Sequence, residues 1–358
     1  MTSGKDVILV TGSSGFIGSR LVERLAERAA VVGLDVKEPA QLPENASFVE
    51  LDLTSDEGVE KALEQVREMH GERIASVVHL AAYFDLTGEP DPKYEAVTVR
   101  GTERLLGGLQ RFTVEQFVYF STMLVHRPGT PEETIDEERP LEKKFPYRNS
   151  KIDTEALIHE KRGDIPVVYL RVAGIYDDGC GSAFLANQIG RVFERNPKSH
   201  VYPGDPATAQ TFLHIEDLED AVERLVDRRR DLPAELPLLV GETEAPSYAE
   251  LQREIGRLIH GEDWQVWQVP KPLAKTGAWL QDAAFSEGAF VKPWMVDIAD
   301  DSYVLDVGRI MKLLDWQPKH TLRETLPKMI EQLKDDPEGW YETNGLDTGR
   351  LDLPKERF

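Results

Sequence analysis

The first apolar run of the chain, Val7–Val10, leads into Thr11-Gly12-Ser13-Ser14-Gly15-Phe16-Ile17-Gly18, and a stretch with helical spacing follows as far as Arg28. A strand, a glycine-rich turn and a helix in this order are typical of dinucleotide-binding proteins. The first glycine permits the tight turn, the second lets the backbone approach a pyrophosphate, and the third lets helix and strand pack closely. The helix start also presents unpaired N–H groups to phosphates. We therefore expect cofactor contacts at Gly12, Ser14, Gly15, Phe16, Ile17 and Gly18.

The same alternation continues through the first half of the chain, where short β-branched runs lead through turns into amphipathic stretches. We expect strands at Val7–Val10, Ala30–Leu34, Ser47–Leu51, Ala75–Leu80, Gln116–Phe120 and Ile165–Leu170, and helices at Phe16–Arg28, Asp56–Met69, Tyr94–Gln110 and Tyr147–Lys161. Alternating units of this length predict a parallel sheet with helices on both faces. The expected fold class is therefore α/β, a doubly wound Rossmann sheet with a smaller C-terminal lobe, and ligands should bind at the carboxyl ends of the strands.

The length and the change in rhythm along the chain suggest how it is divided. The 358 residues are enough for one large α/β domain with an appended lobe. We expect residues 1–175 to form the dinucleotide-binding Rossmann core and residues 176–336 a mixed substrate-binding lobe with elements that return to the core. Residues 337–358 are expected to form a polar tail that Trp340 and Tyr341 anchor.

Composition excludes several classes of partner. A net charge of −22 repels phosphates, so we expect neither nucleic acid nor an anionic membrane as a partner. No apolar stretch approaches the about 18 residues of a membrane span. The single cysteine, Cys180, allows no intrachain disulfide and no cysteine-based zinc site, which fits a cytoplasmic location. The eight histidines form no i,i+4 pair, and we expect no metal.

Further cofactor contacts are expected at the ends of the next strands. A carboxylate at Asp35 would accept hydrogen bonds from ribose hydroxyls and repel a 2′-phosphate, which favours NAD over NADP, although Lys37 leaves room for NADP. The alternative for Asp35 is an ordinary turn residue. Asp52 would reach the adenine edge or close a turn. Small residues at the end of the fourth strand would let the cofactor lie against the backbone, so Leu80, Ala81 and Ala82 are expected contacts. Leu53, next to Asp52 after the third strand, is a further expected contact.

A tyrosine and a lysine four residues apart carry the expected chemistry. On a helix Tyr147 and Lys151 lie one turn apart on one face. A phenol has an ordinary pKa of about 10, and a nearby ammonium favours its ionised form. Thr122, just after the strand Gln116–Phe120, would fix the substrate oxygen, with Ser121 as the alternative. Two exposed helix residues are the other interpretation, but the position after a strand ending in Ser/Thr favours Tyr147 as the acid/base.

A set of segments together forms a more specific pattern, namely Thr11–Gly18, Asp35, His79–Ala82, Gly101-Thr102, Phe120-Ser121-Thr122, Tyr147 with Lys151, Leu170-Arg171 with Ile175-Tyr176, His214-Ile215-Glu216-Asp217 and Leu314-Asp315-Trp316-Gln317-Pro318. In these segments the sequence resembles the extended short-chain dehydrogenase/reductase family, also called the NAD-dependent epimerase/dehydratase family, over roughly residues 6–334. The resemblance implies a Rossmann core, bound NAD(P), and a catalytic triad that maps onto Thr122, Tyr147 and Lys151. It also implies a small-molecule substrate between core and lobe, and a homodimer formed by two helices from each subunit.

Departures from the family pattern bear on the substrate. The family often has Asn shortly before the Gly-Thr pair, where this chain has Thr98. Members that act on nucleotide sugars often carry Asn at the position of Gly174, and usually an arginine at the position of Gln210. The segment Arg171–Tyr176 resembles 3β-hydroxysteroid dehydrogenase-type and dihydroflavonol reductase-type members, whereas Leu314–Pro318 resembles the nucleotide-sugar enzymes. Three functions stay open: an epimerase or dehydratase of a nucleotide-linked sugar, a net dehydrogenase/reductase of a less polar compound, and a non-enzymatic NAD sensor. A sensor has no need for the Tyr–Lys pair.

Two further groups have alternative interpretations. The aromatic stretch comprising Trp264, Trp267, Trp279, Phe285, Phe290 and Trp294 would form lobe core or an oligomer contact, or else a substrate wall. Arg191, Arg195 and Arg309 would bind phosphate, or else lie on solvated helix faces.

Overall fold

A seven-stranded sheet forms the centre of the computed structural model, which describes residues 5–85, 88–271 and 293–351. Its strand order is β13-β9-β7-β5-β1-β2-β3, and every neighbouring pair is parallel. The strands are β1 (Val7–Thr11), β2 (Ala30–Asp35), β3 (Ala46–Glu50), β5 (Ser76–His79), β7 (Phe117–Thr122), β9 (Val167–Val172) and β13 (Glu235–Val240). The predicted doubly wound α/β class is therefore confirmed. The order reverses between β1 and β5, which opens a crevice at their carboxyl ends.

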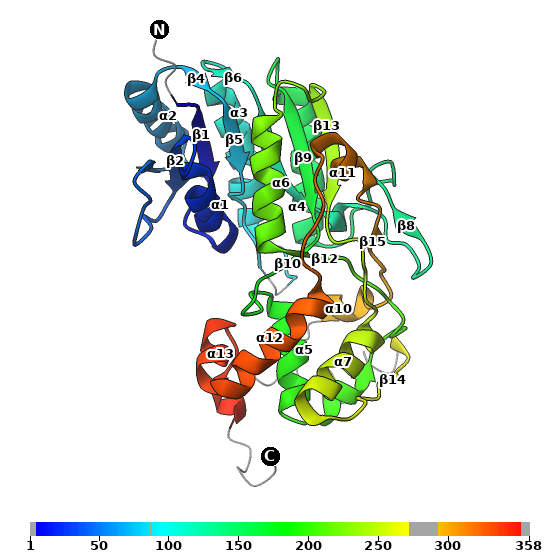
Figure 1. Ribbon diagram of the computed structural model, residues 1–358. Coiled ribbons are helices and arrows are strands. Elements are labelled where there is room, and N and C mark those ends of the chain that lie inside the picture. The colour runs from blue at the N-terminus through cyan, green and yellow to red at the C-terminus, as the bar shows by residue number, and fades with distance from the viewer. Residues whose placement is uncertain (1–4, 86–87, 272–292, 352–358) are drawn as a thin grey trace.

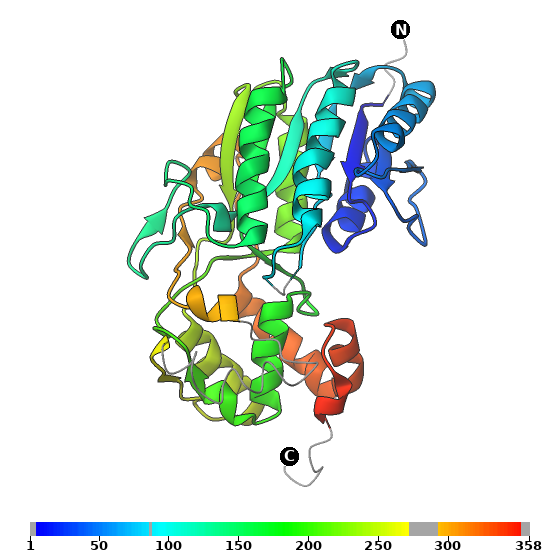
Figure 2. The same ribbon diagram turned by 180° about the vertical axis from the view of Figure 1, so that it is seen from behind.

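Helices cover both faces of the sheet. One face, toward the viewer in Figure 1, carries α1 (Phe16–Ala26), α6 (Ile215–Asp227) and α11 (Gly308–Leu314). The opposite face, toward the viewer in Figure 2, carries α2 (Asp56–His70), α3 (Arg100–Leu109) and α4 (Pro146–Lys161). Each face buries its own apolar cluster, because strand residues point alternately to the two sides. The helix expected from Tyr94 begins instead with a π-helical turn, Tyr94–Val99, that continues into α3.

A helical lobe lies below the carboxyl edge of the sheet (Figure 1). It contains α5 (Ala183–Phe193), α7 (Tyr248–His260), α10 (Pro293–Asp297), α12 (Leu322–Asp335) and α13 (Pro337–Thr343). Short parallel pairs link and flank the two parts: β10 (Gly174–Tyr176) with β12 (Phe212–His214), β11 (Val201–Tyr202) with β14 (Trp267–Gln268), β15 (Val304–Leu305) with β8 (Thr134–Ile135), and β4 (Arg73–Ile74) with β6 (Thr113–Val114). Between lobe elements, the chain returns to the core for α6, β13 and α11.

The described part of the segment expected to be a polar tail, residues 337–351, is folded. Residues 337–351 form α13 and a short 3₁₀ turn, because Trp340 and Tyr341 bury their rings in the lobe core. The Tyr341 hydroxyl donates to Glu194 at 2.8 Å, and Arg350 pairs with the same carboxylate at 2.6 Å. In the described part of the chain, no helix is both long and apolar enough to cross a bilayer.

Candidate cofactor and active site

The glycine turn, Thr11–Gly18, lies at the crevice between β1 and β5. Gly12 has φ of +70°, and a Cβ at this residue would lie 2.9 Å from the amide nitrogen of Ala81. A Cβ at Gly18 would lie 2.0 Å from the Gly12 carbonyl oxygen, so α1 packs on the turn only without one. By contrast, a Cβ at Gly15 meets only that oxygen, at 3.4 Å, within ordinary contact. The turn therefore has tight packing behind it and open space in front.

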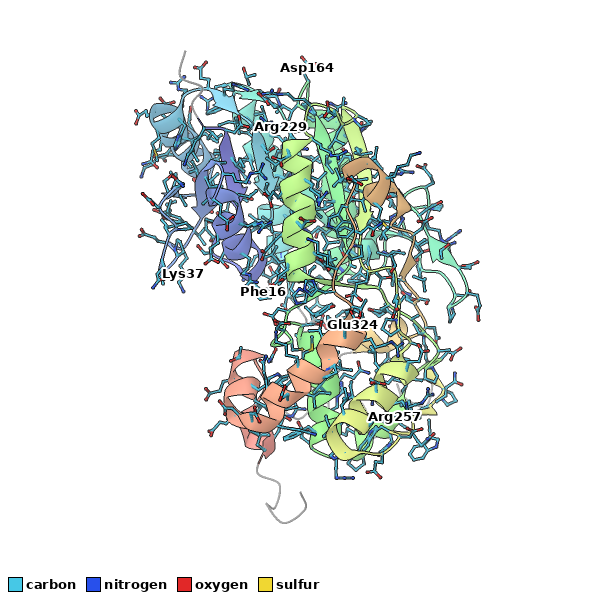
Figure 3. All side chains as sticks on the ribbon, viewed as in Figure 1. Phe16, Lys37, Asp164, Arg229, Arg257 and Glu324 are labelled. Atoms are coloured by element: carbon cyan, nitrogen blue, oxygen red, sulfur yellow. The ribbon has the colours of Figure 1, made fainter. Side chains whose placement is uncertain are left out.

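The start of α1 suits an anion. Gly15 is the N-cap, no side chain caps the helix, and its first turn holds no acidic residue. The first N–H groups of such a helix have no partner within it, and they carry the positive end of the helix dipole. The side chain of Phe16 lies at the end of α1 that faces the lobe (Figure 3), where its ring contacts Gly181. These features fit a dinucleotide pyrophosphate in front of the turn.

The two predicted acidic residues lie at the ends of neighbouring strands. Asp35 ends β2, where it accepts the Ser14 N–H at 3.0 Å and the Val36 N–H at 2.7 Å. It thus fixes the glycine turn as well as facing the crevice. Asp52 follows β3, and its carboxylate accepts both the N–H and the hydroxyl of Thr54, at 2.8 and 2.7 Å. Asp52 closes a turn, one of its two sequence interpretations.

The other predicted cofactor contacts lie around the end of β5. The N–H groups of Leu80 and Ala81 donate to the backbone and side-chain oxygens of Thr11, both at 3.2 Å, so residues 80–82 lie directly against the glycine turn. Leu53 is buried, and its side chain touches Gly101 on α3. His79 lies between the hydroxyls of Thr11 and Thr102, and burial lowers its pKa to about 3. It is a neutral packing residue.

The structure separates the two candidate hydroxyls at the end of β7. The Ser121 hydroxyl donates to Glu155 at 2.6 Å, and Glu155 is itself paired with Arg171 at 2.7 Å; all three residues are buried. Ser121 therefore belongs to an internal network. The Thr122 hydroxyl is close enough to that of Tyr147 to lower its pKa, and Thr122 lines the large cavity described below. Thr122, rather than Ser121, is the hydroxyl next to the phenol.

Tyr147 and Lys151 lie together in the first turns of α4. The ammonium of Lys151 is 5.9 Å from the ring centre of Tyr147 and donates to the Phe120 carbonyl at 2.7 Å, which holds it in place. The ring of Phe84 packs edge-on against Tyr147 with 4.8 Å between centres. Burial raises the pKa of Tyr147 to about 12, while Thr122 opposes the rise. Burial lowers the pKa of Lys151 to about 8, against the pull of Glu155.

A cavity of about 300 Å³ opens beside Thr122, between the core and the lobe. Its wall is mostly apolar and comes from segments far apart in sequence, including Met123, Leu124, Val172, Phe184, Leu185, Phe212, Trp294, Met295 and Ile298. Sequence reasoning did not select most of these residues. The one usable indication was the spacing of Phe184, Gln188 and Arg191, which puts them on one helix face. Trp294 lines the cavity, and its ring also stacks on that of Phe145 with 5.0 Å between centres.

The remaining aromatic and basic candidates differ in surroundings. Trp264 is buried and donates to the Ser199 hydroxyl at 2.8 Å, as expected for lobe core, whereas Trp267 is exposed. Arg195 pairs with Glu262 at 3.0 Å and Arg309 with Glu138 at 2.8 Å, so carboxylates already neutralise both. Arg191 lines the cavity. Three members of the aromatic stretch lie outside the described residues: Trp279, Phe285 and Phe290.

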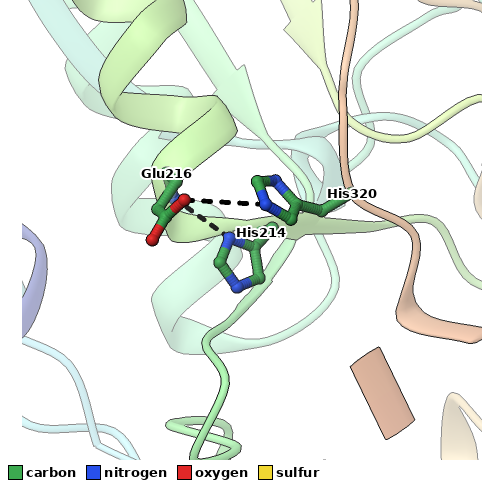
Figure 4. A group of neighbouring side chains, drawn as sticks. All are labelled: His214, Glu216 and His320. Atoms are coloured by element: carbon green, nitrogen blue, oxygen red, sulfur yellow. Dashed lines mark hydrogen bonds and ion pairs between the residues drawn. The ribbon is translucent and has the colours of Figure 1, made fainter. Parts of the chain in front are cut away.

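The fold also brings together His214, Glu216 and His320, a group that no sequence spacing suggested (Figure 4). Their potential ligand atoms lie within 4.8 Å of one another. The two imidazoles stack at 4.2 Å with 27° between planes. An ion binds in the plane of an imidazole, about 2 Å from its nitrogen, so one ion cannot lie in both ring planes. His214 instead accepts the Glu216 N–H at 3.3 Å and caps α6. We assign no metal to this group.

Comparison with known proteins identifies the class. The profile of the NAD-dependent epimerase/dehydratase family matches residues 8–241. The chain belongs to the NAD-dependent epimerase/dehydratase family, as its sequence motifs implied. The prediction of NAD as the cofactor is confirmed with it.

Individual relatives span two kinds of substrate. Short-chain dehydrogenase/reductase family 42E member 1 of Homo sapiens is 30% identical over 236 residues, 61% of this chain and only 58% of that relative. The sterol-4-alpha-carboxylate 3-dehydrogenase (decarboxylating) of Candida albicans is 24% identical over 362 residues, covering 94% of this chain and all of that protein. The solved structure of MoeE5 with UDP-glucose and NAD has a TM-score of 0.69 at 24% identity, covering 93% and 99% of the two chains, and shares the fold.

Proposed function

We propose that this chain is an NAD-dependent oxidoreductase that transfers a hydride at a hydroxyl- or keto-bearing carbon of a mainly apolar small molecule. The observation that carries the proposal is the grouping of Tyr147 and Lys151 with Thr122, which lines the cavity and ends β7, with only β5 between that strand and β1, which leads into the glycine turn. NAD, when bound, accepts the hydride from the alcohol or returns it to the ketone.

The side chains of this site divide the proton work. During oxidation, the Tyr147 phenolate takes the substrate hydroxyl proton as the hydride leaves carbon, and during reduction the phenol gives it back. The Thr122 hydroxyl orients the substrate oxygen. The Lys151 ammonium, held by the Phe120 carbonyl, stabilises the phenolate. For the cofactor, we propose contacts from the glycine turn, Asp35, Asp52, Leu53 and residues 80–82, with Asp35 selecting NAD over NADP.

The cavity supports the less polar substrate class. Its described lining is predominantly apolar, with Arg191 as the one charged side chain. Gln210, which lines the same cavity, stands where nucleotide-sugar members of the resembled family usually carry an arginine. A diphosphate would therefore meet few cations here, whereas a hydrophobic ring system would meet matching surface. The lobe formed by residues 176–336 is proposed as the substrate-binding part.

A Tyr147→Phe variant tests the proposed function. Thermal-shift screening of nucleotide sugars and hydroxysteroids with NAD present first selects a substrate, since stabilisation follows affinity for the native state. We expect Tyr147→Phe to bind NAD normally and to lose several orders of magnitude in turnover. The matched control Tyr169→Phe removes a remote hydroxyl that donates to Glu235, and should retain activity. Normal turnover in Tyr147→Phe contradicts the proposal. So does the finding that ligands bind in the presence of NAD but none is converted, as expected for a non-enzymatic sensor.

We further propose a homodimer and a cytoplasmic location. The helices α3 and α4, which pack side by side on one face of the sheet, would form the dimer contact implied by the family resemblance. Sedimentation of the purified chain at the mass of a single copy contradicts the dimer. A lone buried thiol, Cys180, suits a reducing compartment; cell fractionation that finds the protein elsewhere contradicts the location.

A further inference from the structure

One wall of the substrate cavity changes from apolar to polar with distance from the catalytic end. The helix α5 starts beside the core and runs away from it (Figure 1). Phe184 and Leu185 line the cavity near its start, followed by Gln188 and then Arg191. At 1.5 Å of rise per residue, Arg191 lies about 10 Å further along the axis than Phe184. Tyr248, at the start of α7, lines the cavity together with these residues.

Arg191 has no carboxylate partner among the described residues. Its Nε donates to the Asn187 carbonyl at 3.2 Å, one turn back in the same helix. The nearest acidic neighbour in sequence, Glu194, is already occupied by Arg350 at 2.6 Å and by the Tyr341 hydroxyl. Burial lowers the pKa of Arg191 and repulsion from Arg350 adds to this, while Tyr248 and Glu194, which forms no ion pair with it, act in the opposite direction. A partly desolvated guanidinium without a direct ion pair is unfavourable until an anion approaches it.

The neighbours of Arg191 are hydrogen-bond donors. The side-chain nitrogen of Gln188 is buried with no hydrogen-bond partner in the described structure. The Tyr248 ring is fixed by stacking on Tyr202, 4.1 Å between centres. Burial raises the pKa of its hydroxyl, and the nearby Arg191 guanidinium acts to lower it. A cation, an amide N–H₂ and a phenol at one place match the acceptor oxygens of a carboxylate.

We propose that the substrate is an amphipathic carboxylate, with its reacting hydroxyl or keto carbon at Tyr147, an apolar body along α5, and its carboxylate bound by Arg191, Gln188 and Tyr248. This proposal rests on the proposed function, because it takes the same cavity as the substrate site. The single cationic side chain of the described lining matches one negative charge, and the planar guanidinium matches the two oxygens of a carboxylate.

The test uses two probes that differ only in charge. Binding of 3-hydroxycholanoate, a hydroxysteroid with a carboxylate at its far end, is compared with binding of its methyl ester by calorimetry on the NAD-loaded chain. We expect the acid to bind at least about tenfold more tightly, about 1.4 kcal/mol. Arg191→Gln should abolish this difference and leave the ester unchanged. The control Arg253→Gln removes an equal charge from an exposed position on α7 and should preserve it.

Three results overturn the inference: equal affinities for acid and ester in the unmodified chain, an equal loss for both in Arg191→Gln, or no binding of either probe. UDP-glucose serves as the third ligand, and tighter binding of UDP-glucose than of the acid also overturns it. Failure of the proposed function is seen separately, as absent NAD binding or as unchanged turnover in Tyr147→Phe. With NAD binding and the Tyr147 dependence intact, a failed acid–ester comparison removes only the carboxylate site.

Discussion

Replacing Lys151 by arginine should make Tyr147 a much stronger acid. In the structure, Lys151 has a pKa of about 8 and Tyr147 a pKa of about 12, so the lysine loses its proton before the phenol ionises. Without cofactor, the ammonium and the phenolate therefore do not coexist; the proposed chemistry requires bound NAD, whose positive nicotinamide would favour the phenolate while Lys151 is still protonated. An arginine stays protonated throughout this range, and Lys151→Arg therefore keeps a positive charge beside the ring.

The magnitude follows from the distance. The lysine nitrogen is 5.9 Å from the centre of the Tyr147 ring. At about 6 Å and an effective dielectric constant of about 20, opposite charges attract by about 3 kcal/mol. This corresponds to about 2 pH units, which lowers the pKa of Tyr147 from about 12 to about 10. The Thr122 hydroxyl acts in the same direction in both proteins and cancels in the comparison.

The assay is an NMR titration of the chain labelled at the ζ-carbon of tyrosine. Tyr147→Phe identifies the resonance, and thermal unfolding checks that each variant is folded. We expect the wild-type resonance to stay unchanged up to about pH 11, and that of Lys151→Arg to titrate with a midpoint near about 10. Lys151→Met, which has no charge, should titrate no earlier than wild type. Identical midpoints in Lys151→Arg and Lys151→Met would refute the charge coupling on which the proposed chemistry depends.

Three further variants test the cofactor site and the core. Asp35→Asn should improve NADP binding relative to NAD by removing a repulsive charge, in paired calorimetric titrations; wild-type chain that prefers NADP would contradict this. Gly18→Ala should destabilise the fold by about 3 kcal/mol or more, since its Cβ would overlap the Gly12 oxygen, whereas Gly107→Ala, with open space, should stabilise α3 slightly. Burial raises the pKa of Glu242 to about 7, so the folded state binds the extra proton and unfolding free energy falls as pH rises from about 4.5 to about 7. Glu242→Gln should therefore stabilise the chain by up to about 3 kcal/mol above pH 7 and have no stabilising effect below pH 5. The exposed control Glu244→Gln should leave stability unchanged at both pH values. Equal effects of Glu242→Gln above pH 7 and below pH 5 would contradict the raised pKa.

The fold was accessible from sequence because its signals are local. Each strand–turn–helix unit carries its own β-branched run and helical spacing, and parallel strands place their carboxyl ends at one edge. The sequence predicted that the glycine turn, Asp35 and Thr122, with Tyr147 after them, lie near one another, because each comes after the carboxyl end of a parallel strand. The choice between Ser121 and Thr122 did not, because it depends on Glu155, a residue distant in sequence that binds the serine.

Features made by distant segments were not predictable in the same way. The cavity wall combines residues from α5, β12, α7 and α10, and no single stretch of sequence displays its apolar character. Arg191, Arg195 and Arg309 looked alike in sequence, and only the structure shows that carboxylates neutralise the last two. The C-terminal segment read as polar because charged residues flank its two adjacent aromatic anchors, yet these anchors bury together against α5.

A crystal structure of the chain with NAD tests the central claim most directly. The account predicts the pyrophosphate against the N–H groups of the glycine turn, a ribose on Asp35, and the nicotinamide beside the hydroxyl of Tyr147 and the ammonium of Lys151. A dinucleotide bound elsewhere, or a nicotinamide ring out of reach of the Tyr147 hydroxyl, would contradict it.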